Sequence, residues 1–217
     1  MVRRFFCPLA GSDTRGEYLK AIIITPAYCG TVHELDEVIR ASGLPWLVLH
    51  EHSDLPRARS VLFTHALEKF QAEVIVAVDA DNVPTVQQLE TVIGHAADGH
   101  AAFGCYIQRD GKRLSVQPLD SAAGERCLAS GDSFELEFAG LGFAAFHKSS
   151  LESASAHMER VRELGAEPWL PFCVPLLLPG GLYLADDRSL CHRLRESGTR
   201  LLCYPELRVK HSIRQLV

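Results

Sequence analysis

The sequence has no apolar run that approaches the ~20 residues needed by a membrane-spanning helix, so it predicts no membrane span. Its N-terminal Arg-Arg-Phe-Phe, residues 3–6, faintly resembles an export signal, but Pro8 and Gly11 cut the apolar region too short. An excess of basic residues is also missing. The formal net charge of −5 argues against non-specific nucleic-acid binding, which needs a basic face.

Paired cysteine motifs are likewise missing. The seven cysteines form no C-x-x-C pair, so they indicate neither a zinc cluster nor a disulfide framework. Reduced thiols in a cytoplasmic setting are the corresponding expectation. The composition itself is ordinary for a globular protein, with 47% hydrophobic and 23% charged residues. A chain of 217 residues can form one α/β domain with a sizeable core, or at most two small domains.

The most informative stretch is residues 74–82, Val-Ile-Val-Ala-Val-Asp-Ala-Asp-Asn. Its unbroken apolar run predicts a strand buried on both faces, as in parallel sheets. Asp79 and Asp81 fall at the carboxyl end of this strand and, two residues apart, point the same way in an extended backbone. Two such carboxylates suit a divalent metal that keeps positions open for phosphate oxygens. The alternative is that Asp81 and Asn82 merely begin a turn before Pro84.

The rest of the N-terminal half repeats this pattern. Apolar runs at 21–25, 46–49, 74–78 and 100–107 alternate with helical spacing, which predicts a mainly parallel sheet with helices on both faces. The pattern changes after residue 107. We expect loops or hairpins over 108–133, a half-exposed strand at 134–138, a strand at 143–146, a helix over 149–165 and a covering loop over 167–182. A helix beginning near Asp186 and a last strand at 201–204 follow.

Several polar groups lie where a ligand would bind. Tyr28 follows the first buried strand and could stack on a nucleobase or cap the core. Arg57 and Arg59 lie in the first turn of a helix, where cations oppose the macrodipole. A diphosphate would remove that conflict, although simple surface charge is the alternative. The His-Glu-His sequence at 50–52 could be a metal site, but such residues are more often solvated polar groups at a strand end.

Six segments in order along the chain resemble one known family. They are Ile-Thr-Pro-Ala-Tyr at 24–28, Pro-Arg-Ala-Arg at 56–59, Val-Asp-Ala-Asp at 78–81, Gly-Leu-Gly-Phe at 140–143, Ala-Asp-Asp at 185–187 with Cys191 and Arg193, and His211. Together they resemble a glycosyltransferase of the GT-A fold, in particular the large inverting family-2-like nucleotide-sugar transferases of bacteria and phages. The resemblance implies a single Rossmann-like domain over 1–217, with a nucleotide-binding half (1–107) and an acceptor-binding half (108–217) that contains a smaller antiparallel part.

The resemblance also implies an activity and roles for individual residues. A sugar would pass, with inversion, from a nucleoside-diphosphate donor to an acceptor hydroxyl on an acceptor that the sequence does not identify (saccharide, small molecule or protein). Asp79 would bind ribose or metal, Asp81 would hold Mn²⁺ or Mg²⁺ on the diphosphate, and His211 would be the third metal ligand. The expected donor-binding residues are Thr25, Pro26, Tyr28, Arg57, Arg59, Asp79, Gly140 and Gly142.

Catalysis is expected from the two acids that begin the last helix. Asp187 matches the family's general base, and Asp186 stands where the family usually carries Glu, so the division of labour between them stays open. Ser60 likewise replaces an Asn that often follows the Arg-Ala-Arg run. Physical chemistry fits the scheme, because a metal can stabilise a leaving diphosphate and a carboxylate can deprotonate the acceptor.

Two other functions are compatible with the sequence. Residues 79–83 also resemble the nucleophile loop of haloacid-dehalogenase-type Mg²⁺-dependent phosphatases, with Asp186 and Asp187 as their magnesium acids. That loop normally follows the first strand, whereas two strands precede it here. The second alternative is a sugar- or nucleotide-binding module that has lost catalysis.

Overall fold

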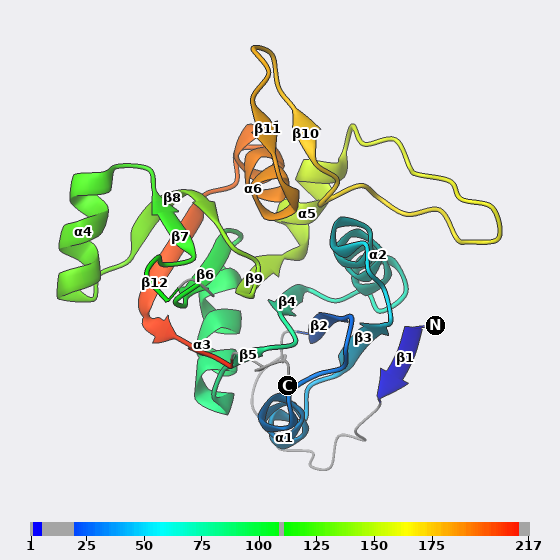
Figure 1. Cartoon of the computed structure of the whole chain (residues 1–217), viewed down its shortest axis with the longest axis horizontal. Coiled ribbons are helices and arrows are strands. Elements are labelled where there is room, and N and C mark those ends of the chain that lie inside the picture. Colours follow the sequence, from blue (N-terminus) through cyan, green and yellow to red (C-terminus); the bar gives the residue numbers. More distant parts are fainter. Residues whose placement is uncertain (1, 6–19, 109–110, 213–217) are drawn as a thin grey trace.

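The computed structural model describes residues 2–5, 20–108 and 111–212 (Figure 1). The helices are α1 (His33–Ser42), α2 (Leu55–Glu68), α3 (Val86–Ala96), α4 (Ser121–Ser130), α5 (Lys148–Ser155) and α6 (Asp186–Glu196). The strands are β1 (Val2–Phe5), β2 (Ala21–Ala27), β3 (Trp46–His50), β4 (Val74–Val78), β5 (Asn82–Val83), β6 (Ala101–Cys105), β7 (Val116–Pro118), β8 (Phe134–Ala139), β9 (Phe143–His147), β10 (Leu176–Leu177), β11 (Tyr183–Leu184), β12 (Leu201–Arg208) and β13 (Lys210–His211).

A nine-stranded sheet forms the centre, in the order β1-β3-β2-β4-β9-β6-β12-β8-β7. β2 pairs in parallel with β3 and β4, and β12 pairs in parallel with β6. β9 lies antiparallel between β4 and β6, so these two strands run in the same direction. The prediction of an α/β fold with one mainly parallel central sheet is therefore confirmed, with β4 in its interior. The antiparallel part expected in the C-terminal half is formed by β7, β8 and β9.

Both faces of the sheet are covered by helices, as the continuous apolar runs predicted. In β4, Ile75 packs into the core cluster shared with α2, α5 and α6, and Val76 packs into the cluster shared with α1 and α3. All five residues of β4 are buried. The two groups of helices lie on opposite sides of the sheet in Figure 1. Since the helices occupy both faces, the sheet's carboxyl edge is the side on which polar residues can gather.

Three segments differ from the sequence-based expectations. Residues 108–133 were expected as loops or hairpins, yet they contain β7 and the helix α4, which Asp120 caps by accepting the N–H of Ala123. The expected helix over 149–165 ends at Ser155. Its charged remainder is not helical, and within it Arg160 forms an ion pair with Glu68 of α2. The expected covering loop over 167–182 contains β10, which pairs with β11 just after the loop to form a β-hairpin.

At the N-terminus, β1 pairs antiparallel with β3. Residues 6–19, which include the interruptions at Pro8 and Gly11, lie outside the described residues. None of the helices in the described part of the chain combines the length and the apolar character that crossing a bilayer requires.

Candidate functional site

The two acids after β4 are held in place by backbone bonds from both halves of the chain. The N–H of Asp79 donates to the carbonyl of Gly142 (3.0 Å), and the N–H of Asn82 donates to the carbonyl of Asp79 (3.0 Å). Asn82 then belongs to β5, which pairs antiparallel with β13 so that it faces His211. Ser212 donates its N–H to the carbonyl of Asp81 (2.7 Å). The C-terminal strand thus returns His211 to the acids, 130 residues after Asp81 in sequence.

The side chains of Asp81 and His211 face each other. Nε2 of His211 lies 3.3 Å from Oδ2 of Asp81, and both side chains are largely buried. The other ring nitrogen, Nδ1, lies 2.9 Å from the carbonyl oxygen of Ile107 and must carry a hydrogen, because a carbonyl can only accept. In the neutral ring, the lone pair of Nε2 therefore points at a carboxylate. A cation between the two groups, or a proton on Nε2, resolves this contact, and a backbone-anchored imidazole beside a carboxylate oxygen is a common metal-ligand pair.

Asp79 has a different partner. Nη2 of Arg59, on α2, donates to both of its carboxylate oxygens (2.7 and 2.9 Å), and Nη1 of Arg59 bonds to Asp186 at the start of α6. Burial alone would lower the pKa of Arg59, but the charges of the two carboxylates and the hydrogen bond to Asp79 outweigh it and raise that pKa. This buried triad joins three segments that are far apart in sequence. Within the described residues, no group of three or more His, Cys, Asp or Glu side chains surrounds a metal position.

Asp187 differs from its neighbour Asp186. It accepts the N–H of Arg188 (2.8 Å), and Ala185, which makes no side-chain bond, occupies the N-cap of α6. Burial, followed by the negative charge of Asp186, raises the pKa of Asp187 above its usual range. The structure thus separates the two acids: Asp186 is bound to Arg59, whereas Asp187 is a partly desolvated carboxyl group beside it.

Gly140 and Gly142 are glycines because other side chains occupy the space next to them. A Cβ at Gly140 would lie 2.5 Å from the hydroxyl of Tyr106, and one at Gly142 would overlap the amide of Asn82 and lie 2.7 Å from the same hydroxyl. Gly142 also donates its N–H to that hydroxyl (3.2 Å). Tyr106 and Asn82 therefore occupy the space beside these glycines, and the donor-binding role of the glycines stays a prediction.

Tyr106 is a site residue that the sequence analysis missed. It follows β6 directly, as Asp79 follows β4, and its ring packs edge-on against His211 with centroids 5.6 Å apart. Burial, followed by the charge of Asp79, raises the pKa of its hydroxyl, and the charge of Asp187 adds to this effect. Position at the carboxyl end of a buried strand was the signal that could have identified it.

Arg57 is held by a residue 106 positions later. Its Nε donates to both carboxylate oxygens of Glu163 (2.7 and 2.9 Å), and its guanidinium lies over the ring of Trp169, 6.0 Å from the centroid. Its Nη1 also contacts His52. The hydrogen bonds that Arg57 donates to the carboxylate of Glu163 raise the pKa of Arg57. This contact fixes the segment after α5 to the first turn of α2, and a phosphate contact by Arg57 stays a prediction.

The predicted donor-binding residues at the end of β2 differ in exposure. Thr25 is buried in β2 and accepts the indole N–H of Trp46 (3.0 Å), and Pro26 follows it in the same strand. Tyr28 lies just beyond β2 with 64% of its surface exposed, so it does not cap the core. The interpretation of Tyr28 as a cap on the core is therefore wrong, and its stacking on a nucleobase stays a prediction.

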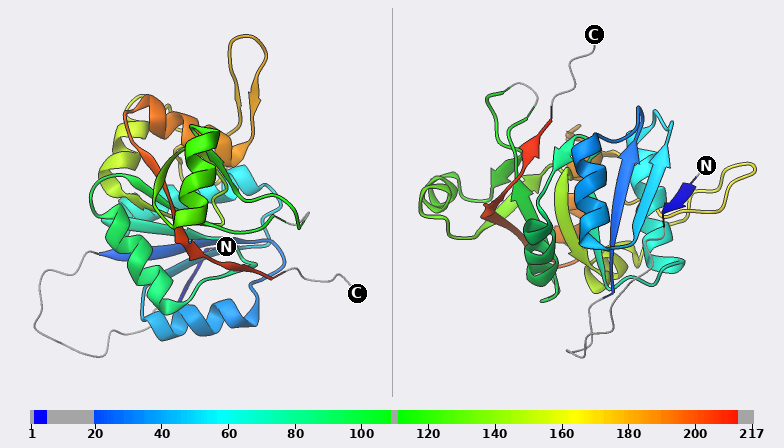
Figure 2. Two further views of the ribbon diagram at one scale, coloured as in Figure 1. Left: turned by 90° about the vertical axis from the view of Figure 1, so that its left-hand side faces the viewer. Right: turned by 90° about the horizontal axis from the view of Figure 1, so that it is seen from below.

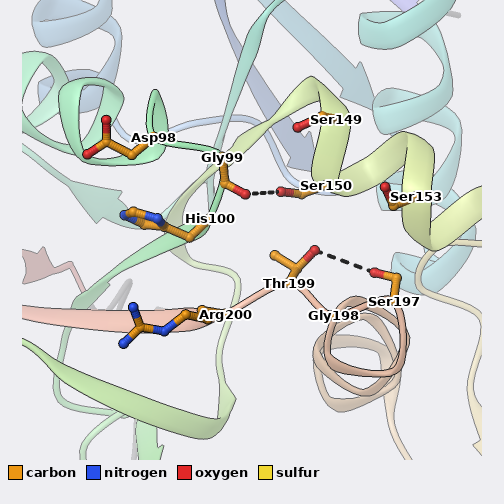
Figure 3. Close-up of a pocket in the computed structure, with 10 residues that line it drawn as sticks. All are labelled: Asp98, Gly99, His100, Ser149, Ser150, Ser153, Ser197, Gly198, Thr199 and Arg200. Carbon is orange, nitrogen blue, oxygen red and sulfur yellow. Dashed lines mark hydrogen bonds between the residues drawn. The ribbon is translucent and has the colours of Figure 1, made fainter.

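A pocket of about 330 Å³ lies away from these residues (Figure 3). It is formed where β6 and β12 begin, and its lining includes His100, Ser150 and Arg200. Ser150 donates its hydroxyl to the carbonyl of Gly99 (2.8 Å). This pocket is at the amino edge of the parallel strands, so its lining includes none of the acids Asp79, Asp81, Asp186 and Asp187. A second pocket of about 310 Å³ borders His211 and is lined also by Arg208 and Lys210.

Comparison with known proteins identifies the fold. No protein-family model and no curated protein matches the sequence. Among solved structures, GalNAc-T7 with UDP, GalNAc and Mn²⁺ is similar, with a TM-score of 0.55, 13% identity and coverage of 91% of this chain and 44% of that one. This chain has a GT-A-like fold. The A197 protein from STIV is also similar, with a TM-score of 0.54, 14% identity and coverage of 91% of this chain and 96% of that one.

Identities this low establish the GT-A-like fold and no further relationship. The chain spans less than half the length of the GalNAc-T7 chain that it matches. The fold prediction is thereby supported independently of the sequence motifs, while the roles of the individual acids depend on the geometry of the site described above.

Proposed function

We propose that the protein is a metal-dependent glycosyltransferase that moves a sugar, with inversion, from a nucleoside-diphosphate donor to an acceptor hydroxyl. The observation that carries this proposal is the gathering of three acids, a histidine and an arginine at one sheet edge. Asp81 faces His211 there, and Asp79 is joined to Asp186 through Arg59. A glycosyl transfer needs charge stabilisation on the diphosphate side and a base on the acceptor side, and this edge supplies residues for both.

Asp81 and His211 would hold Mn²⁺ or Mg²⁺, and Asp79 is the proposed third ligand. Carboxylate oxygens suit both ions, and the carbonyl of Ile107 orients the imidazole so that Nε2 is the ligating atom. The metal, when bound, would supply positive charge for the leaving diphosphate. Arg59 already binds Asp79, so a metal and Arg59 would share this carboxylate.

Asp187 is the proposed general base. Asp186 is held by Arg59, whereas the pKa of Asp187 is raised by burial and by Asp186, which makes its carboxylate a better proton acceptor. Its role is to take the hydroxyl proton as the acceptor oxygen attacks the anomeric carbon from the face opposite the diphosphate. Asp186 is the proposed positioning residue, because its ion pair with Arg59 fixes the start of α6 and with it the place of Asp187.

The donor-binding residues proposed are those at the ends of β2 and α2 and around β9. Tyr28 would stack on the base, Thr25 and Pro26 would shape the loop beneath it, and Arg57 and Arg59 would face the diphosphate. Gly140 and Gly142 would let Tyr106 and Asn82 pack closely against the backbone at the floor of the site. The scattered thiols agree with a reducing, cytoplasmic compartment, which also remains a proposal.

The phosphatase alternative has less support. It would use Asp79 as a nucleophile, but both oxygens of that carboxylate accept hydrogen bonds from a buried arginine. Charge pairing of this kind lowers the nucleophilicity of the carboxylate. In addition, Asp79 follows the third strand of the parallel series, after β2 and β3, and not its first.

A thermal-shift screen of UDP, GDP, CDP and dTDP sugars, with and without Mn²⁺, tests the proposal. A ligand at about 100 times its Kd stabilises by about 2.7 kcal/mol, which raises the Tm of a chain of this size by roughly 5–10 °C. We expect such a shift for one nucleotide, dependent on Mn²⁺ and lost in Asp81→Asn. The control Asp98→Asn, far from the acids, should retain it. A shift that persists in EDTA would contradict metal dependence, and metal-dependent binding without any donor turnover would indicate the binding module.

A further inference from the structure

Three consecutive residues at the end of β6 hold the segment that carries His211. The carbonyl of Cys105 accepts the N–H of Val209 (3.0 Å), and the carbonyl of Ile107 accepts the Nδ1–H of His211 (2.9 Å). Between them, Tyr106 packs its ring against the imidazole in a T-shaped contact, with centroids 5.6 Å apart. In Figure 2, the C-terminal strands (red) accordingly run beside green segments from the middle of the chain, which include β6. The end of β6 therefore sets the place and the orientation of the His211 ring.

The hydroxyl of Tyr106 contacts the segment that holds Asp79. It accepts the N–H of Gly142 (3.2 Å), and the carbonyl of the same glycine accepts the N–H of Asp79 (3.0 Å). One residue therefore links the tyrosine hydroxyl to the backbone of the first acid. Tyr106 contacts His211 with its ring and Gly142 with its hydroxyl, so a single side chain connects two of the three proposed metal ligands.

Tyr106 is itself fixed in place. It is only 8% exposed, its N–H donates to Oγ of Ser115 (3.2 Å), and its carbonyl accepts the N–H of Ser115 (2.9 Å). The carbonyl of Ser115 in turn accepts the N–H of Gly140 (2.7 Å). A Cβ at Gly140 would lie 2.5 Å from the tyrosine hydroxyl, so the backbone closes tightly around it. A side chain that is locked by packing and hydrogen bonds can hold the groups beside it in one geometry.

A second polar side chain lies beside this hydroxyl. Asn82 is fully buried, and neither its amide nitrogen nor its amide oxygen has a hydrogen-bond partner among the described residues. The place that a Cβ of Gly142 would take lies 2.2 Å from the Asn82 amide and 2.7 Å from the Tyr106 hydroxyl. Asn82 is also directly opposite His211 in the β5–β13 pair. A buried amide without a partner is costly, and departures of this kind are typical of functional sites and not of an ordinary core.

We propose that Tyr106 is a positioning residue of the metal site: its ring orients His211, and its hydroxyl, through Gly142, places Asp79. The inference rests on the proposed function, because a divalent ion held by Asp79, Asp81 and His211 is what these contacts would serve. Residues that orient metal ligands without touching the ion typically change metal affinity by about 10–100-fold when they are replaced. Tyr106 supports ligands from two distant parts of the chain, so its replacement should have an effect of this size.

Titration of the full chain with Mn²⁺ alone, followed by electron paramagnetic resonance, tests this role. Tyr106→Phe keeps the ring beside His211 and removes the hydroxyl, so we expect the Kd for Mn²⁺ to rise by about tenfold. Tyr106→Leu removes both contacts and should raise the Kd further, by up to about 100-fold. Tyr204→Phe is the matched control, because the hydroxyl of this partly buried tyrosine contacts Nε2 of His100 (3.4 Å), in the pocket lining that contains none of the acids. It should bind Mn²⁺ as the wild type does.

The spin-echo envelope modulation of bound Mn²⁺ separates positioning from a general loss of structure, because it detects the nitrogen of a ligating imidazole. At saturating Mn²⁺ we expect the nitrogen signal in wild type and Tyr106→Phe. In Tyr106→Leu the signal should be lost although His211 is present, and His211→Ala gives the reference spectrum without it. Urea denaturation in EDTA checks that each variant is folded. If Tyr106→Leu does not fold, the comparison of Tyr106→Phe with Tyr204→Phe decides.

The possible failures are distinguishable. Equal Mn²⁺ affinity of wild type and Tyr106→Phe, or an equal loss in Tyr204→Phe, would overturn the positioning role and leave the proposed function standing. An unchanged nitrogen signal in Tyr106→Leu would show that the ring does not orient His211, which also contradicts the inference. A wild type that binds no Mn²⁺ would remove the metal-dependent function and this inference together.

Discussion

Replacing Arg59 should have the largest effect of any single charge change in this protein. The Arg59 side chain is only 7% exposed, and its partners Asp79 and Asp186 are 24% and 17% exposed. A pair of unit charges about 4 Å apart gains about 4 kcal/mol at an effective dielectric constant of 20, before desolvation is subtracted. Removing one member of such a buried pair costs about 3–5 kcal/mol, because the remaining charges are left uncompensated.

We therefore expect Arg59→Met to lower the free energy of unfolding by about 3–5 kcal/mol in urea denaturation at pH 7. Arg59→Lys should lose less, since it keeps the charge but cannot bond to both carboxylates at once. Adding Asp79→Asn and Asp186→Asn to Arg59→Met should recover part of the loss, because the uncompensated charges are removed with their cation.

Arg195→Met is the control for this series. Arg195 is exposed in the last turn of α6, so its replacement should change stability by no more than about 0.5 kcal/mol. If Arg59→Met is as mild as Arg195→Met, Arg59 does not join the two acids and the description of the site is wrong. If Arg59→Met cannot be folded, the lysine variant and the triple variant still provide the comparison.

Three further predictions concern the acids and a glycine. Asp187→Asn should reduce sugar transfer by about 10²–10⁴ and leave the affinity for metal and nucleotide unchanged; an unchanged rate in Asp187→Asn with a reduced rate in Asp186→Asn would exchange their roles. The same Asp187→Asn change should raise the unfolding free energy at pH 7. Folding raises the pKa of Asp187, so the native state binds the proton of this carboxyl group more tightly than the unfolded state does. The free energy of unfolding of the wild type therefore falls as pH rises from the unfolded-state pKa to the folded-state pKa. The loss is about 1.4 kcal/mol for each pH unit between these two values. The gain in unfolding free energy of Asp187→Asn should therefore vanish below the pKa of Asp187 in the unfolded state. A gain that does not change with pH would contradict a raised pKa of Asp187 as its cause. Gly142→Ala should cost about 1–3 kcal/mol through overlap with Asn82 and Tyr106, whereas Gly94→Ala in α3, which has open space, should be neutral or stabilising in the same chemical denaturation; equal effects would contradict this.

The parallel core of the central sheet could be predicted because β2, β3, β4 and β6 each contain an uninterrupted apolar run. Val74–Val78 is buried on both faces, so burial itself produced the sequence signal. The place of β9 could not be predicted, since its neighbours β4 and β6 are chosen by long-range pairing that leaves no local pattern. The segment after Ser155 was wrongly expected to be helical. Its contacts are with distant residues, such as that of Arg160 with Glu68, 92 residues earlier, and these leave no local pattern in the sequence.

The site was predictable in part for a similar reason. Residues that directly follow a buried parallel strand lie at the carboxyl edge of the sheet, which predicts the positions of Asp79 and Asp81. The resemblance to the glycosyltransferase family implied that His211 joins them, and in the structure His211 lies beside Asp81. The partners of Arg59 could not be predicted, because Asp186 comes from a helix 127 residues later. The expectation that Arg59 faces a phosphate stays untested, and its carboxylate partners came only from the folded geometry.

Binding of Mn²⁺, measured by the loss of the free-ion signal in electron paramagnetic resonance, tests the site most directly. The titration is run with and without the nucleotide identified by the thermal-shift screen, on wild type and on Asp81→Ala, His211→Ala and His33→Ala. His33 is a suitable control because its side chain is 80% exposed on α1. We predict that wild type and His33→Ala bind Mn²⁺ together with nucleotide, whereas Asp81→Ala and His211→Ala do not; equal binding by all four proteins would contradict a metal site at the carboxyl edge of the sheet.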